Sequence, residues 1–327
     1  MTRRLTVRQE SWPLKQPFVI SRLRQETAEL VVVEIELDGL VGRGETERAE
    51  AFDPDAPPVA GEIERARREI ERGITRYELL SFMPAGNART AVDCALWDLE
   101  AKAAGRPAWE LAGLDPPGAI TTAYTLSLGT PEAMAAEATR NAKRPLLKLK
   151  LGGADDLERV AAVRAAAPDC RLIADANEGW QESDLADFLQ GLAAAGVALI
   201  EQPLPAGRDA ALIEVEHPLP VCADESFQDR ASLPALAGRY DYVNIKLDKA
   251  GGLTEALAAA RAAQAAGFRL MLGCNVGTSL AMAPACLLAG LADFVDLDGP
   301  LLLARDRTPG LTYNGSIIEP PNAELWG

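Results

Sequence analysis

The chain has 327 residues, 48% hydrophobic and 25% charged, which is long enough to bury a barrel-sized core beside a smaller domain. Its formal net charge of −15 argues against nucleic-acid or anionic-membrane partners, because both would repel it. The amino terminus carries no apolar signal segment and no apolar run reaches about 18 residues, so we expect a cytoplasmic protein.

The first third of the chain predicts an α+β domain. Its expected strands lie at residues 5–12, 30–37 and 41–45. Apolar residues of 87–104 recur on one helical face and predict a helix. The segments 13–26 and 47–58 are long for simple connections, and long loops of compact domains often form lids. We therefore predict a capping domain over 1–115 that carries substrate lid loops.

From residue 116 the chain alternates strands and helices. Seven strand ends recur at intervals of 22 to 27 residues, the length of one strand, one helix and two loops; they are Lys150, Asp175, Glu201, Asp224, Lys246, Gly273 and Asp296. With a first strand at 120–126, eight strands result, which predicts a modified TIM barrel of the (β/α)7β kind over 116–300. The remaining segment, 301–327, is expected to pack back on the capping domain.

Two lysines share the inward face of the strand at 146–151. Side chains alternate along a strand, so Lys148 and Lys150 point into the barrel while the intervening leucines face the helices. Their mutual repulsion predicts a lowered pKa for at least one of them, as a lysine general base requires. The alternative is a structural ion pair with an inward carboxylate. Lys246 ends the sixth strand, so it is expected to face Lys150 across a ring of eight.

Three successive strands end on carboxylates, those of Asp175, Glu201 and Asp224. Hard oxygen ligands without a thiolate or a nearby imidazole suit Mg²⁺ or Mn²⁺ better than Zn²⁺. A single aspartate at a strand end more often caps a helix, but three buried carboxylates without a cation would be costly. We expect a Mg²⁺ site, with Mn²⁺ as the other candidate. The supporting residues expected around it are Asn177, Glu225 and Asn244.

This arrangement predicts a proton-transfer reaction. A substrate carboxylate on the cation would hold its α-carbon between Lys150 and Lys246, so that one lysine removes the α-proton and the other returns one on the opposite face. Asp296 and Asp298 share a face of the eighth strand, opposite the metal, and are interpreted as a site for a cationic substrate group. Helix caps facing solvent are the alternative for these two aspartates.

The distance between the metal and the eighth strand decides the class of substrate. The ammonium of a free amino acid is attached to the reacting carbon and cannot reach that wall, whereas one more residue adds about 3.3 to 3.6 Å. The pattern therefore predicts a dipeptide that is inverted at its carboxy-terminal α-carbon.

Other chemistries lack the residues that they need. The only histidine, His217, lies in an expected loop, so Ser-His and Cys-His catalysis have no well-placed base. The Gly42-Arg43-Gly44 run lacks the third glycine of a dinucleotide fingerprint, and no P-loop is present. Five scattered cysteines without a C-x-x-C pair indicate neither a disulfide framework nor a thiolate metal site.

The same residues carry a resemblance to a known family. The motifs are LKLK at 147–150, DAN at 175–177, EQP at 201–203, ADES at 223–226, NIKLDKAGG at 244–252 and DLDGP at 296–300. They resemble the muconate-lactonizing subgroup of the enolase superfamily, and the Asp-x-Asp pair resembles its dipeptide epimerases, particularly those for L-Ala-D/L-Glu. The resemblance covers nearly the whole chain. It implies the capping domain, the barrel, the metal triad and the two lysine bases, and gives Lys148 a supporting role near the substrate carboxylate.

The lid departs from that pattern. The resemblance implies a lid arginine that pairs with the side-chain carboxylate of the substrate, but a count from Pro17 puts Leu23 at its place. Arg22 or Arg24 would then have to reach the substrate, and both could instead be solvated surface residues. Cys274 and Thr278, which follow the seventh strand, are expected to line the substrate site.

Three hypotheses about function follow. The first is a Mg²⁺-dependent epimerase of L-Ala-D/L-Glu or a related Ala-Xaa dipeptide. The second is a relative that acts on another carboxylate: an o-succinylbenzoate synthase, an N-acylamino acid racemase or a muconate cycloisomerase. The third is a catalytically silent metal- or peptide-binding protein, which predicts that a base or a ligand is missing, and none is. The resemblance also suggests a role in recycling cell-wall peptides, and the sequence is compatible with a homo-oligomer.

Overall fold

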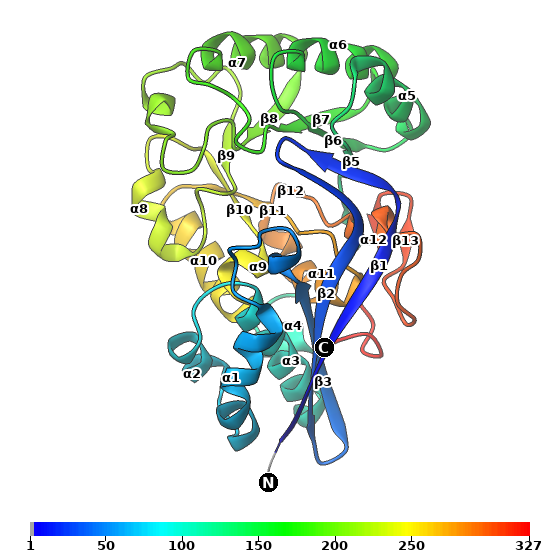
Figure 1. Cartoon of the computed structure of the whole chain (residues 1–327), viewed down its shortest axis with the longest axis vertical. Coiled ribbons are helices and arrows are strands. Elements are labelled where there is room, and N and C mark those ends of the chain that lie inside the picture. Colours follow the sequence, from blue (N-terminus) through cyan, green and yellow to red (C-terminus); the bar gives the residue numbers. More distant parts are fainter. Residues whose placement is uncertain (1–2) are drawn as a thin grey trace.

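The computed structural model describes residues 3–327 and contains an antiparallel sheet, a curled sheet of eight parallel strands and a small third sheet (Figure 1). The elements of the capping domain are β1 (Arg4–Ile20), β2 (Leu23–Leu37), β3 (Leu40–Glu47), η1 (Ala49–Ala51), α1 (Val59–Arg72), α2 (Arg76–Phe82), α3 (Asn87–Ala104) and α4 (Ala108–Leu111). The helix expected at 87–104 is confirmed at both ends.

The lid is a β-hairpin, so the loop expected over 13–26 is wrong. Pairing between β1 and β2 is interrupted after Pro13 and resumes at Phe18, opposite Gln25, which leaves only Ser21 and Arg22 as the turn. Polar residues form strands here because each strand satisfies the backbone hydrogen bonds of the other. The hairpin runs upward over the barrel in Figure 1, and Val19 accepts a hydrogen bond from Leu128 N–H at 2.9 Å.

Eight parallel strands form the barrel. They are β5 (Tyr124–Leu126), β6 (Leu146–Lys150), β7 (Arg171–Asp175), β8 (Val197–Glu201), β9 (Val221–Ala223), β10 (Tyr242–Ile245), β11 (Arg269–Leu272) and β12 (Phe294–Val295), hydrogen-bonded in that order. The first and last strands approach each other through Ala123 N–H, which donates to the Val295 carbonyl at 2.8 Å. The sheet thus curls into the predicted TIM-like barrel.

The strand expected at 120–126 is divided between two sheets. Its first part, β4 (Ile120–Thr121), pairs antiparallel with β14 (Ile317–Ile318), which in turn pairs with β13 (Tyr313–Asn314). Only β5 belongs to the barrel. The pairing partner of 120–121 lies almost 200 residues away, so local pattern alone does not reveal the division.

Helices and turns connect the strands of the barrel. They are α5 (Pro131–Asn141), α6 (Asp156–Ala166), α7 (Leu185–Ala194), η2 (Ala210–Ile213), η3 (Arg230–Ser232), α8 (Leu233–Leu236), α9 (Leu247–Ala250), α10 (Leu253–Ala265), α11 (Ser279–Cys286), η4 (Ala289–Leu291) and α12 (Gly299–Leu302). Thr130 caps α5 by accepting from Ala133 N–H at 3.3 Å. After β8 the connecting helix is reduced to the short turn η2.

The interior of the barrel is apolar at one end and charged at the other. Leu146, Tyr242 and Phe294 belong to a buried cluster inside the barrel, near the beginnings of their strands. Toward the strand ends, the interior positions of β6 are Lys148 and Lys150, both buried. Leu147 and Leu149 instead join the core between strands and helices, which confirms the predicted alternation.

The end of the chain contacts the capping domain. Arg43 donates to the Leu325 carbonyl at 2.9 Å, the Trp326 indole donates to the Cys94 carbonyl at 3.0 Å, and Gly327 N–H donates to Asp98 at 2.8 Å. The exact boundaries of 1–115, 116–300 and 301–327 stay a prediction.

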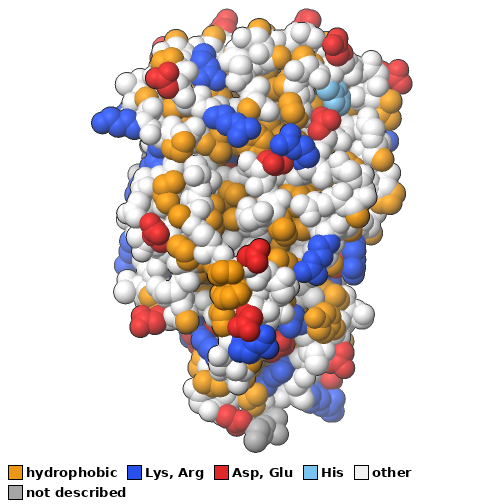
Figure 2. Space-filling view, turned by 180° about the vertical axis from the view of Figure 1, so that it is seen from behind, with side chains coloured by type: hydrophobic (Ala, Val, Ile, Leu, Met, Phe, Trp, Pro, Cys, Tyr) orange, Lys and Arg blue, Asp and Glu red, His pale blue; other side chains and the backbone are white. Residues whose placement is uncertain are grey.

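The surface shows mixed charges. On the face in Figure 2, acidic and basic side chains are interspersed among apolar and neutral ones. None of the described helices is both long and apolar enough to cross a membrane.

Candidate active site

The three predicted metal ligands lie together at the carboxyl ends of adjacent strands. Asp175 and Glu201 end β7 and β8, and Asp224 follows β9. One carboxylate oxygen from each lies within 4.8 Å of the others, and all three residues are buried. Such a set of hard, anionic oxygens fits Mg²⁺. The neighbouring strands bring these ligands together because parallel strands end at the same rim.

Lys148 neutralises much of the charge on this side of the barrel. Its Nζ lies 2.7 Å from Glu201, 2.8 Å from Asp296 and 3.3 Å from Asp175. Burial alone would lower the pKa of Lys148, but the three carboxylates hold it well above its ordinary value. The lowered pKa expected from repulsion between lysines is therefore wrong for Lys148, because the carboxylates around it outweigh the neighbouring ammonium group.

The two predicted bases, Lys150 and Lys246, each contact one predicted metal ligand. Lys150 Nζ donates to Asp175 at 2.6 Å, and Lys246 Nζ donates to Asp224 at 2.7 Å. Burial would lower the pKa of Lys246, but Asp224 and then Glu201 raise it above its ordinary value. A divalent cation on the same oxygens would offset the negative charge that causes this rise.

The carboxylates respond to the same charges. Burial would raise the pKa of Asp175, yet Lys150 and Lys148 hold it at about 2. Burial likewise opposes ionisation of Asp224, but Lys246 and Lys249 keep its pKa well below the ordinary range. The lysines thus keep both carboxylates ionised although both are buried.

Lys249 is a contact that sequence reasoning missed. It lies on α9, three residues after Lys246, and its Nζ donates to a carboxylate oxygen of Asp224 and to the Asn244 carbonyl, the latter at 3.1 Å. The spacing of three residues, almost one helical turn, is the signal that could have found it.

The supporting residues are near the triad, as expected. Asn244 Nδ2 donates to Glu201 at 2.6 Å, and Asn177 N–H donates to Asp175 at 2.9 Å. Glu225 accepts from Asn177 Nδ2 at a longer 3.4 Å.

Asp296 and Asp298 line the opposite wall. Asp296 accepts from Lys148, whereas Asp298 accepts from Thr125 N–H at 2.6 Å. Burial, and next the charge of Asp296, raises the pKa of Asp298 to about 7. Asp298 precedes α12 but makes no side-chain hydrogen bond to the start of that helix, so it does not act as a helix cap.

One cavity of about 260 Å³ joins these groups beneath the lid. Its lining residues are Phe18, Ile20, Arg22, Leu23, Gln25, Glu47, Thr125, Lys148, Lys150, Asn177, Glu225, Lys246, Cys274, Asn275, Val276, Asp296, Asp298, Gly299 and Leu302. Both predicted bases therefore face the same space as Asp296 and Asp298, which follow β12.

The two lid arginines differ in position. Arg22 lines the cavity, donates to the Asn177 carbonyl at 3.0 Å and pairs with Glu225 at 2.7 Å. Arg24 is exposed outside the cavity and pairs with Glu26 at 3.3 Å.

Cys274 and Thr278, which follow β11 and are both expected to line the substrate site, also differ in position. Cys274 lines the cavity. Thr278 lies outside its lining: it caps α11, and both its N–H and its hydroxyl donate to buried Glu45 of β3, at 2.7 and 2.6 Å. Thr278 therefore joins the barrel to the capping domain.

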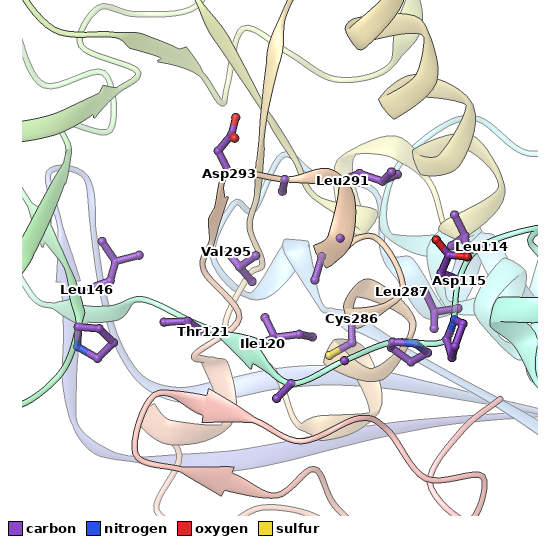
Figure 3. A pocket seen from close by; sticks show the side chains of 18 of the residues that line it. Leu114, Asp115, Ile120, Thr121, Leu146, Cys286, Leu287, Leu291, Asp293 and Val295 are labelled. Carbon is purple, nitrogen blue, oxygen red and sulfur yellow. The ribbon is translucent and has the colours of Figure 1, made fainter.

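A second cavity, of about 500 Å³, lies at the other end of the barrel. Ile120, Leu146 and Cys286 are among the side chains that surround it in Figure 3. Its charged residues are Asp115, Arg171 and Asp293. Its lining includes none of the lysines that contact the triad, whereas the smaller cavity under the lid is lined by all three, so the smaller cavity is the candidate active site.

The parallel barrel, its capping domain and the acidic strand ends together define an enzyme of the enolase superfamily. Family models match residues 2–113 as the mandelate racemase/muconate lactonizing enzyme N-terminal domain and residues 133–323 as an enolase C-terminal domain-like unit. The chain belongs to the mandelate racemase/muconate lactonizing enzyme family, which confirms the resemblance seen in its motifs.

Two relatives are similar over most of their length. The L-Ala-D/L-Glu epimerase of Escherichia coli (strain K12) is 48% identical over 95% of this chain and 98% of the relative. The N-acetyl-D-glutamate racemase of a Pseudoalteromonas species is 49% identical over 80% of this chain and 82% of the relative. Epimerases and racemases are isomerases, which agrees with the predicted enzyme class.

Solved structures show the same similarity. An enolase family member from Agrobacterium tumefaciens, with homology to dipeptide epimerases and with bound sodium and L-Ala-L-Glu, superposes with a TM-score of 0.96 at 48% identity, over 99% of this chain and 100% of the other. A dipeptide epimerase from Enterococcus faecalis V583, complexed with Mg and L-Leu-L-Tyr, gives a TM-score of 0.90 at 30% identity, over 98% of both chains.

Proposed function

We propose that this enzyme is a Mg²⁺-dependent dipeptide epimerase that inverts the α-carbon of the carboxy-terminal residue, with L-Ala-D/L-Glu or a related Ala-Xaa dipeptide as substrate. The supporting observation is that one small cavity is lined by Asp296 and Asp298 and by three lysines, each of which contacts a carboxylate of the acidic triad. The relatives of similar length named above support the same reaction.

The residues divide the work as follows. Asp175, Glu201 and Asp224 hold the cation, which when bound supplies Lewis-acid stabilisation of the charge that develops on the substrate carboxylate. Lys150 and Lys246 are the two bases: one Nζ takes the α-proton, and the other delivers a proton to the opposite face of the same carbon.

The remaining contacts orient the dipeptide. Lys148 is directed at the substrate carboxylate, and Asp296 with Asp298 receives the ammonium group of the first residue. Arg22 pairs with an acidic side chain on the second residue, in exchange for its present contact with Glu225. Arg24 is not needed in this arrangement, because it lies outside the cavity.

A second candidate is racemisation of an N-acylated glutamate. The relative named N-acetyl-D-glutamate racemase favours it, because its identity to this chain is nearly the same as that of the dipeptide epimerase, although over a smaller share of the chain. Such a substrate has no free ammonium group, so it would leave the acidic wall at Asp296 and Asp298 without a cationic partner.

Deuterium incorporation separates the two candidates. The protein is incubated with Mg²⁺ in D₂O with L-Ala-L-Glu, a pool of other L-Ala-L-Xaa dipeptides, or N-acetyl-L-glutamate, and mass spectrometry measures exchange at the α-carbon. We expect exchange and inversion in L-Ala-L-Glu at the carboxy-terminal residue. No exchange in any dipeptide would refute the epimerase proposal, and exchange only in the acylated substrate would establish the racemase.

We further propose that the enzyme is cytoplasmic and acts in the recycling of cell-wall peptides. All five cysteines are free, as expected in a reducing compartment. The charge of −15 supports a small-molecule substrate rather than a nucleic-acid or anionic-membrane partner.

A further inference from the structure

Glu47 is a carboxylate of the cavity that the proposed reaction does not use. It is the last residue of β3 in the capping domain, yet it lines the cavity together with lid and barrel residues. Its side chain is partly buried, and the charged groups that act on it most are Asp248 and Lys246 of the barrel. A residue at the junction of three parts of the molecule can hold them together.

Two amide groups donate to the two oxygens of Glu47. Gln25 Nε2, on the lid strand β2, donates to Oε1 at 3.3 Å. Asn275 Nδ2, in the loop after β11, donates to Oε2 at 2.9 Å. The carboxyl group thus links the lid to the barrel rim, with one hydrogen bond on each side.

The strand end that carries Glu47 is itself held firmly. Thr46 donates from its hydroxyl to Asp248 at 2.6 Å, and Asp248 lies two residues after Lys246. Asn87, the first residue of α3, donates to the Glu47 carbonyl at 3.1 Å. The link from Gln25 therefore ends on a strand end that is held by α3 and by the barrel.

Further contacts hold the first strand of the lid, where Val19 accepts from Leu128 N–H, and its tip. Ser21 Oγ donates to the Asn177 carbonyl at 2.8 Å, and Arg22 pairs with Glu225. The proposed substrate would take Arg22 from Glu225, so the tip contacts loosen during binding. The link at Gln25 involves neither Arg22 nor Glu225, so this exchange does not break it.

The carboxyl group of Glu47 has a raised pKa. Burial, then the charge of Asp248, raises the pKa of Glu47 to about 7, although Gln25, Lys246 and Asn275 all oppose the rise. Glu47 is partly buried, and hydrogen bonds from Gln25 and Asn275 cover its two oxygens.

We propose that Glu47 is a positioning residue that latches the lid hairpin to the barrel through Gln25 and Asn275. The latch holds the lid side of the cavity, including Leu23 and Arg22, over the substrate. This inference deepens the proposed function, since it concerns the same site, but the lid contact exists whether or not a dipeptide is the substrate.

Trypsin tests the latch without any substrate. The lid tip carries two cleavage sites, Arg22 and Arg24, which a closed hairpin protects because a protease needs locally opened chain. We expect Glu47→Ala to raise the rate of cleavage at these sites about tenfold, the effect of losing a hydrogen bond to a charged group, with an unchanged melting temperature of the barrel. Glu47→Gln keeps one acceptor oxygen and should give an intermediate rate.

The control is Glu34→Ala. Glu34 lies on the same hairpin and pairs with Arg8 of β1, so its loss removes an ion pair within the capping domain and leaves the lid contact intact. Its cleavage rate at Arg22 and Arg24 should equal that of the wild type. Should Glu47→Ala fail to fold, Asn275→Ala removes the same contact from the barrel side.

Kinetics and a double-mutant cycle complete the test. Glu47→Ala should raise KM for L-Ala-L-Glu about tenfold and change kcat much less, because it opens the lid without removing a base. The effects of Glu47→Ala and Asn275→Ala should not multiply in the double variant, since both break one link. Cleavage at the wild-type rate in both single variants, or fully multiplicative effects, would overturn the latch. Dipeptides that fail to react would refute only the proposed function, because the cleavage assay contains none.

Discussion

Charge pairing between lysines and carboxylates organises the site at the scale of single residues. Lys150 contacts Asp175 and Lys246 contacts Asp224, so each proposed base is aligned by a proposed metal ligand. The sequence predicted the identities of these groups because each ends a strand. It did not predict which lysine contacts which carboxylate, since that depends on distances across the barrel.

Removal of either base should stop inversion. We expect Lys150→Ala and Lys246→Ala each to lower epimerisation of L-Ala-L-Glu about 10²- to 10⁴-fold, the usual contribution of a general base. One variant should still exchange the α-proton of one enantiomer, because the remaining lysine reaches only one face. Chiral chromatography with mass spectrometry in D₂O measures both effects. Lys143→Ala, an exposed lysine, is the control, and full activity in both site variants would contradict the assignment of bases.

The acidic preference should depend on Arg22. Arg22→Met should lower kcat/KM for L-Ala-L-Glu about 10- to 100-fold, as expected for loss of a hydrogen-bonded charge pair, and should change kcat/KM for L-Ala-L-Leu little. Arg24→Met, two residues further along the same hairpin, provides the matched control. An equal loss for both dipeptides would show that Arg22 supports the lid rather than recognising the side chain.

At the scale of elements, α3 of the capping domain supports the turn that follows Lys246. Arg89 donates to the carbonyls of Ala250 and Gly251 at 2.6 and 3.0 Å, and Asp93 accepts from Thr254 N–H at 2.9 Å. Helix α3 thus fixes the loop after β10 and, through this loop, the position of Lys246.

Gly252 should tolerate no side chain. Its φ is +109°, and a Cβ there would lie 2.4 Å from Asp93, so Gly252→Ala combines backbone strain with a clash. We expect a loss of unfolding free energy of about 2 to 4 kcal/mol and a lower kcat. Gly238→Ala is the control, because Gly238 has φ +77° but open space around its Cβ. Denaturant titration that shows equal losses in both would mean that strain alone acts.

Asp93 should make stability depend on pH. Burial raises its pKa from the ordinary 3.8 to about 6, although Thr254, Arg76 and Arg89 oppose the rise. The folded state therefore binds more protons than the unfolded state between about pH 4 and 6, and the contribution of Asp93 falls as pH rises through that window. Asp93→Asn should remove this part of the decline, as thermal unfolding from pH 4 to 7 can measure. A parallel decline in wild type and variant would contradict the raised pKa.

At the scale of the whole molecule, one partly buried arginine joins both domains and the last segment of the chain. Arg307 contacts Glu45 of β3 and Glu10 of β1, each at 2.6 Å, and donates to the hydroxyl of Thr278 at 2.7 Å. Glu45 is completely buried, so this cation offsets the cost of burying its charge.

Arg307→Met should destabilise the whole molecule. It leaves Glu45 buried without a cationic partner, for which a loss of about 3 to 5 kcal/mol in unfolding free energy is expected. The double variant with Glu45→Gln should recover part of that loss, because the uncompensated charge is gone. Urea titration measures both, and a double variant no more stable than Arg307→Met would show that packing, rather than charge, dominates.

The sequence by itself determined the barrel, the triad and the three lysines, because strand period and strand ends are local properties of the chain. The tertiary structure alone decided features that depend on partners far along the chain. It divided 120–126 between two sheets, turned the lid loop into a hairpin, moved Thr278 to the domain junction and brought Glu47 into the cavity. It also placed Lys148 among three carboxylates that raise its pKa, since the sequence shows that lysines are neighbours but only the folded barrel shows how many carboxylates surround them.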